Sequence, residues 1–196
     1  MNFLYGDVSE NYVKYVINTY GRDCIVCFDG YTDVSKSTKV AEQNRRGDHN
    51  VSADVIFDGK TPVVNSQQSI LANRNNKARI INKMMEGLEV EGVRCCQSVA
   101  DADYLIASTT ILKAGSMQFP VVLVGNDTDL LVMLIHGSKT KNVYMQFGKD
   151  SAYNGHSIVQ NLKSSVSRHI LIAHAISGCD TVSALYGVGK KTAVAV

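Results

Sequence analysis

Six aspartates lie beside apolar runs in four separate parts of the chain. They occur in the pieces CFDG, ADADY, GNDTDLL and SGCDT, as Asp29, Asp101, Asp103, Asp127, Asp129 and Asp180. Apolar runs tend to be buried, so these carboxylates could converge at one edge of a sheet. Carboxylates a few ångströms apart cannot all stay ionised without cations. Hard divalent ions with oxygen ligands, Mg²⁺ or Mn²⁺, suit them, and the pattern predicts metal-dependent phosphate chemistry with a pair of ions.

Each piece also has an ordinary structural explanation. Asp29 before a glycine is typical of a turn, and Asp101 and Asp103 suit the start of a helix. Asp127 and Asp180 could each cap a following element. The six aspartates taken together are a more specific signal than any one of them, because each of four separate segments places an Asp at the end of an apolar element.

The elements that must position these residues alternate along the chain. Helical spacing or composition predicts helices over 9–20, 73–92 and 100–115, one or two helices over 158–177 and a last helix within 184–196. Short apolar runs predict strands over 24–28, 93–97, 120–125 and 142–147, with a weaker candidate at 51–57. A further apolar run covers 130–136.

Strands that alternate with helices indicate an α/β fold: a three-layer α/β/α sandwich with a mainly parallel central sheet. In such a sheet, ligands bind beyond the carboxyl ends of the strands. Asp29 follows the strand at 24–28 and Asp127 follows the strand at 120–125. A turn can aim Asp129 into the same crevice, so the metal site is expected at this edge.

Bulk properties narrow the function classes. The 196 residues are enough for one large domain, or for a domain with a small appendage. The net charge of +2 is too small to attract the whole protein electrostatically to nucleic acid or to a membrane. Neither a membrane span nor a secretory signal stands out, so we expect an intracellular protein of the nucleus or cytoplasm without membrane contact. A phosphatase or kinase is disfavoured because there is no Walker-type loop and no nucleophile elbow.

Zinc chemistry is disfavoured as well. Cys24 and Cys27 lie within one predicted strand, where they would point to opposite faces, and the five histidines show no ligand spacing. Cys95, Cys96 and Cys179 are expected to be small buried residues in a reducing compartment.

Two weaker signals concern phosphate binding. The glycines of GVGKKTA, Gly187 and Gly189, precede a helix start whose free N–H groups suit a phosphate, although a plain glycine turn explains them about as well. A polar stretch at 31–50 is basic, and a solvated loop is its simpler explanation. Its cations are Lys36, Lys39, Arg45 and Arg46.

From about Cys24 to Val196, the chain contains FDG, a basic stretch, ADADYLIA, a strand followed by DTDLL, then GCD and GVGKKTA. This succession of motifs resembles the flap endonuclease (XPG-type) branch of the PIN-like nuclease superfamily. The chain is closer still to uncharacterised PIN-like proteins of animals, some linked to mobile elements, which share STK, NK-x-R, DADYLI and DTDLLV.

The resemblance implies roles for these residues. All six aspartates match metal-site positions, although Asp-Ala-Asp stands where flap endonucleases carry Glu-x-Glu. The basic residues at 36–46 match a helical arch that steers the scissile phosphate. A hairpin that grips the duplex backbone, often with a monovalent cation, corresponds to Gly187, Val188, Gly189, Lys190, Lys191 and Thr192.

The resemblance also implies a domain plan: a PIN-like nuclease core at 1–178, with an arch-like segment at about 31–50, and a truncated helix–two-turn–helix element at 179–196. The family's N-terminal strand with its Asp has no counterpart before Gly21. The function implied is divalent-metal-dependent hydrolysis of phosphodiester bonds in branched or flapped DNA, of the structure-specific 5′ nuclease type. The alternative is an inactive nuclease-like domain that binds DNA or a protein partner.

Overall fold

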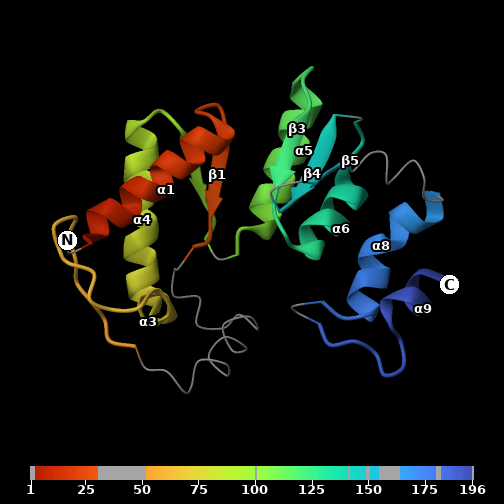
Figure 1. Ribbon diagram of the computed structural model, residues 1–196. Helices are drawn as coiled ribbons and strands as arrows, with labels where there is room; N and C mark the ends of the chain where they lie inside the picture. The colour runs from red at the N-terminus through yellow and green to blue at the C-terminus, as the bar shows by residue number, and fades with distance from the viewer. Residues whose placement is uncertain are drawn as a thin grey trace. The chain divides into compact units, whose positions relative to one another are not determined.

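A computed structural model describes residues 3–30, 52–99, 101–140, 142–148, 151–154, 164–179 and 182–195 (Figure 1). The chain divides into two compact units, Met1–Ala102 and Asp103–Val196, and each is described by itself. Both combine helices with short strands, and both contain a pair of parallel strands. The predicted mixed α/β character with parallel strand pairs is therefore confirmed.

The first unit packs helices against two strands. Its elements are α1 (Tyr5–Tyr20), β1 (Ile25–Phe28), α3 (Gln67–Ala72), α4 (Arg74–Val90) and β2 (Arg94–Gln97). Strands β1 and β2 pair in parallel, with Ile25 opposite Arg94 and Phe28 opposite Gln97. Both strands lie within the ranges predicted from the apolar runs, whereas α3 was not predicted.

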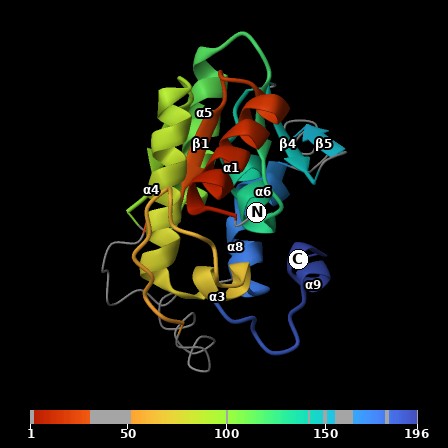
Figure 2. The ribbon, with the colours of Figure 1, turned by 60° about the vertical axis from the view of Figure 1, so that its left-hand side comes forward.

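Helices α1 and α4 lie side by side and bury the core of this unit (Figures 1 and 2). The buried side chains come from both helices and from the strand ends: Val13, Phe28, Ile81, Leu88 and Val93. A side chain at Gly87 would place its Cβ 2.9 Å from Cγ2 of Val13, so glycine permits this close approach of the helices.

Helix α1 is one turn longer than the predicted 9–20. The backbone N–H of Leu4 donates to the Asp7 carboxylate at 2.9 Å, which helps to organise the additional first turn. The helix ends as predicted at Gly21, whose φ of 78° is unfavourable for other residues. Between residues 3 and 24 the chain is therefore mainly helix before β1 begins.

The prediction of a strand at 51–57 is wrong for the described residues 52–57, which form no strand. Side chains of α4 take the place of a neighbouring strand as hydrogen-bond partners. Asn76 accepts from the Val55 N–H at 2.8 Å and donates to the Ala53 carbonyl at 2.9 Å. Arg79 donates to the Val55 carbonyl and pairs with Asp54. The segment's backbone is thus satisfied without a sheet.

The second unit is built around β3 and β4. Its elements are α5 (Asp103–Ser116), β3 (Val121–Val124), α6 (Thr128–Gly137), β4 (Val143–Phe147), β5 (Ser151–Asn154), α8 (Ser164–Ile176) and α9 (Lys190–Ala195). Strand β4 pairs in parallel with β3 and antiparallel with β5. The antiparallel strand β5 was not predicted. Helix α5 packs on β3 and α6, and α6 packs on α8.

The apolar run at 130–136 is part of helix α6. Leu130 and Leu134, four residues apart, lie on the same face and are buried with Leu123, Val143 and Met145. This core joins α6 to both parallel strands. It therefore fixes where the first turn of α6 lies relative to the end of β3.

Among the helices of the described ranges, none combines the length and the apolar character needed to cross a bilayer.

The core of the second unit can be tested at Leu134, whose side chain is completely buried. Replacing it with alanine leaves a cavity, and we expect the free energy of unfolding to fall by about 2–5 kcal/mol. Denaturant unfolding followed by circular dichroism measures this. Leu112→Ala is the control, because Leu112 is 73% exposed on α5. An equal loss in both variants would contradict the packing described.

The role of Asn76 can be tested separately. Asn76→Ala leaves the Val55 N–H and the Ala53 carbonyl without their side-chain partner, at a cost of about 1–3 kcal/mol. Hydrogen exchange at the Val55 amide should accelerate by the corresponding factor. Asn75→Ala is the matched control, because the Asn75 side chain is exposed and donates to the Asp54 carboxylate, not to the backbone of Val55 or Ala53. Unchanged exchange at Val55 in Asn76→Ala would refute this role.

Candidate metal centre

The turn between β3 and α6 carries two of the predicted site residues. Asp127 is the N-cap of α6, and its Oδ1 accepts the backbone N–H of Asp129 at 2.8 Å. Capping satisfies a helix N–H that would otherwise have no partner. The structural role that we considered for Asp127 is therefore real. Its Oδ2 has no hydrogen-bond donor among the described residues, so one carboxylate oxygen remains available.

The same turn is tied to the end of β4. The Gly125 N–H donates to the Gln146 carbonyl at 3.0 Å, and the Gly148 N–H donates to Oδ1 of Asn126 at 2.7 Å. A Cβ at Gly125 would lie 2.9 Å from Cδ1 of Leu130, so glycine permits the turn to pack directly on α6. These contacts hold the Asp127 and Asp129 backbone at the carboxyl ends of parallel strands, as predicted.

Both carboxylates lie at the positive end of the α6 dipole. Asp129 is in the first turn, and both side chains are half-buried. The helix end favours negative charge there, so it partly offsets the repulsion between two neighbouring carboxylates. The arrangement can accept a cation without first having to be assembled.

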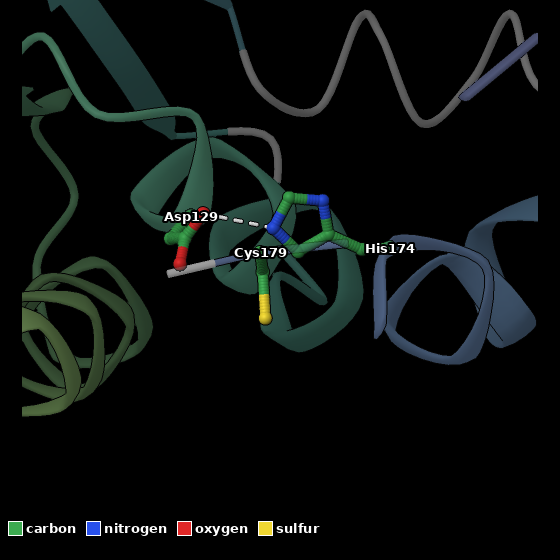
Figure 3. Close-up of side chains that lie close together, drawn as sticks. All are labelled: Asp129, His174 and Cys179. Atoms are coloured by element: carbon green, nitrogen blue, oxygen red, sulfur yellow. Dashed lines mark hydrogen bonds and ion pairs between the residues drawn. The ribbon is translucent and has the colours of Figure 1, made fainter. Parts of the chain in front are cut away.

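Asp129 also contacts a histidine that sequence reasoning did not single out. His174 Nε2 lies 2.8 Å from Oδ1 of Asp129, and the two side chains are 12% and 22% exposed. His174 belongs to the last turn of α8, and Cys179 follows that helix. The ligand atoms of Asp129, His174 and Cys179 all lie within 4.8 Å of one another (Figure 3). The sequence offers no local signal for this group, because α6 and α8 meet only in the fold.

Asp103 lies in the same unit, as the first residue of α5. It is half-buried, and its helix packs against both β3 and α6. The alternative explanation for Asp103, a helix-start residue, is consistent with this position.

In the first unit, Asp29 and Asp101 lie near each other. Oδ1 of Asp29 accepts the Ala102 N–H at 3.0 Å, directly after Asp101. A Cβ at Gly30 would lie 2.0 Å from the Ser98 carbonyl oxygen, so only glycine allows the chain after β2 to pass this closely. Asp29 is exposed at the carboxyl end of β1. Its carboxylate thus holds the segment that carries Asp101.

The predicted DNA-binding hairpin is described in part. Gly187 has a left-handed φ of 78°, and the Val188 N–H donates to the Leu185 carbonyl at 3.0 Å, which makes a turn before α9. The side chains of Lys191 and Thr192 are exposed. Asp180 and the four basic residues at 36–46 lie outside the described residues.

No family model and no curated protein matches the chain. Solved structures do match, and two of them are the catalytic core of Rad2 in complex with DNA substrate, as complex II and complex III. The first shares 15% identity and a TM-score of 0.55, over 98% of this chain and 55% of the Rad2 chain. The second shares 14% identity and a TM-score of 0.54, over 97% and 51%.

This chain therefore spans about half the length of those structures. At such identity the likeness concerns the fold alone. The chain has a fold similar to that of the Rad2 catalytic core.

Proposed function

We propose that this chain is the core of a divalent-metal-dependent nuclease that hydrolyses phosphodiester bonds in DNA. The observation that carries the proposal is the β3–α6 turn. It holds Asp127 and Asp129 at the carboxyl ends of parallel strands, at a helix N-terminus. The fold likeness to a catalytic core bound to DNA substrate supports the same function.

The donor chemistry fits hard cations. Asp127 offers Oδ2 and Asp129 offers carboxylate oxygen, the ligand type that Mg²⁺ and Mn²⁺ prefer. A pair of such ions, when bound, lowers the pKa of attacking water and neutralises charge on the scissile phosphate. The protein's part is to hold these carboxylates on a rigid turn and to orient the phosphate beside them.

The other proposed metal-site residues rest on the resemblance of the sequence. They are Asp29, Asp101, Asp103 and Asp180. Asp29 already accepts one backbone hydrogen bond, so only its remaining lone pairs are available for a cation.

The DNA contacts are proposed for two segments. Gly187, Gly189 and Thr192, with Lys190 and Lys191, would hold duplex phosphates without reading sequence, with a monovalent cation at the hairpin. The second segment is a basic arch formed by Lys36, Lys39, Arg45 and Arg46. Branched or flapped duplex is the proposed substrate, and the nucleus or cytoplasm is the proposed location.

The proposal also includes a domain plan and a family branch. The domain plan is a three-layer PIN-like core over 1–178 followed by a helix–two-turn–helix element from 179. The branch is the XPG-type, mobile-element-linked one. The shared segments DADYLI and DTDLLV support it.

Asp127→Asn is the sharpest test of the nuclease proposal. Asparagine still caps a helix, so the fold is retained while the negative charge is lost. We expect Mg²⁺-dependent cleavage of a flapped oligonucleotide to fall by at least about 100-fold, since even outer partners of metal ligands cost 10–100-fold. A gel-based cleavage assay of wild type and variant, with and without EDTA, measures this.

Equal, metal-independent cleavage by both proteins would reject the assignment. If the wild type binds an uncleaved duplex in calorimetry with Mn²⁺ but does not turn over a flapped substrate, the alternative of an inactive DNA-binding domain replaces the nuclease proposal.

Lys191→Ala tests the hairpin. If Lys191 neutralises one phosphate, the variant should bind duplex more weakly whatever its sequence, and the slope of log affinity against log salt should decrease by about one. Fluorescence anisotropy across a salt series measures both. Lys14→Ala is the control, because Lys14 is exposed on α1 and pairs with Glu10. If wild type and Lys191→Ala have the same slope, the hairpin does not contact the DNA phosphates through Lys191, and this part of the proposal is wrong.

A further inference from the structure

The group formed by Asp129, His174 and Cys179 differs chemically from a carboxylate cluster. It offers one oxygen, one nitrogen and one sulfur ligand, all within 4.8 Å (Figure 3). Imidazole and thiolate favour Zn²⁺ and similar transition metals, whereas Mg²⁺ takes oxygen ligands. The structure thus holds donors for a second class of ion beside the proposed magnesium ligands.

The spacing of the donor atoms suits a tetrahedral ion. Zinc bonds of typical length place an oxygen or sulfur ligand about 3.4–3.6 Å from a nitrogen ligand. The observed separation of His174 Nε2 and Asp129 Oδ1 is 2.8 Å, and the group's upper limit is 4.8 Å. The separations of the donor atoms, from 2.8 Å to at most 4.8 Å, lie on both sides of the required value, so changes of up to about 1.2 Å in these separations would complete the site.

Local structure holds each of the three residues in place. Asp129 is in the capped first turn of α6, and His174 is in the last turn of α8, which packs against α6. Cys179 exchanges backbone hydrogen bonds with Val182, at 2.9 and 3.2 Å. Gly178, with φ of 91°, turns the chain between helix and cysteine. Such support reduces the entropy lost when a metal binds.

An ion pair between His174 and Asp129 is the simpler explanation of their contact. It does not account for a thiol at the same point. Cys179 is a thiol and is half-buried, as are both other residues. The coincidence of three different ligand types from two helices and the following segment favours a metal.

We propose that Asp129, His174 and Cys179 bind a transition-metal ion of the Zn²⁺ class, with a fourth position left to water or another ligand. The ion would tie the start of α6 to the end of α8 and the segment after it. The inference does not depend on the nuclease activity, since only Asp129 belongs to both proposals. His174 and Cys179 therefore distinguish them.

Cobalt titration of the reduced, metal-free full chain tests the proposal, with Co²⁺ as the spectroscopic probe for Zn²⁺. We expect one equivalent to produce a near-ultraviolet charge-transfer band from thiolate to cobalt and visible bands of a tetrahedral ion, both abolished by added Zn²⁺. Cys179→Ser should remove the charge-transfer band, and His174→Ala should weaken binding at least 10-fold.

Cys96→Ser is the matched control, because Cys96 is a half-buried thiol of β2 in the other unit. It should leave both spectrum and affinity unchanged. Circular dichroism of the metal-free variants checks their folding. If Cys179→Ser does not fold, Cys179→Ala with a Zn²⁺ melting series replaces it, and a Zn²⁺-induced rise in melting temperature equal to that of wild type would overturn the proposal.

Absence of a thiolate band in the wild type, or a band that persists in Cys179→Ser, would also overturn it. No DNA is present in these titrations. A negative cobalt titration would therefore not contradict the proposed Mg²⁺-dependent cleavage. Likewise, a lack of DNA cleavage would not contradict the proposed transition-metal site.

Discussion

The turn after β3 is the constraint on which the candidate site depends. Backbone pairing of Gly125 with Gln146, and the Asn126 contact with Gly148, fix the turn to the end of the parallel neighbour β4. The buried face of α6 then fixes the direction in which the helix leaves. With both ends held, Asp127 and Asp129 have little freedom. Negative charge gathered in this way is stabilised by the helix end and by any cation that binds.

Two of the proposed metal-site aspartates also stabilise the local structure through hydrogen bonds. Asp127 caps α6, and Asp29 holds the chain at Ala102. Such dual use is compatible with metal binding, because a carboxylate accepts several contacts through its two oxygens. Asp129 differs because its partner is the imidazole of His174. It therefore links the oxygen-ligand chemistry of the β3–α6 turn with the softer ligands supplied by α8 and Cys179.

Much of the fold was predictable from sequence because it is encoded locally. The apolar runs predicted β1 to β4, and helical spacing predicted α1, α4 and α5. The failures arose where partners distant in the sequence decide the outcome. Residues 52–57 look like a strand, but Asn76 and Arg79 of α4 bind their backbone. The positions of Asp127 and Asp129 followed from the strand-end rule. The contact with His174 could not be predicted, because it depends on how α6 packs against α8.

The most direct test of the account is a crystal structure of the chain soaked in Mn²⁺, with data collected at the manganese absorption edge. An anomalous peak in contact with a carboxylate oxygen of Asp127 or Asp129 is the predicted result. Well-ordered density for this turn with no such peak beside either carboxylate would contradict the claim that the β3–α6 turn is built to hold a divalent cation.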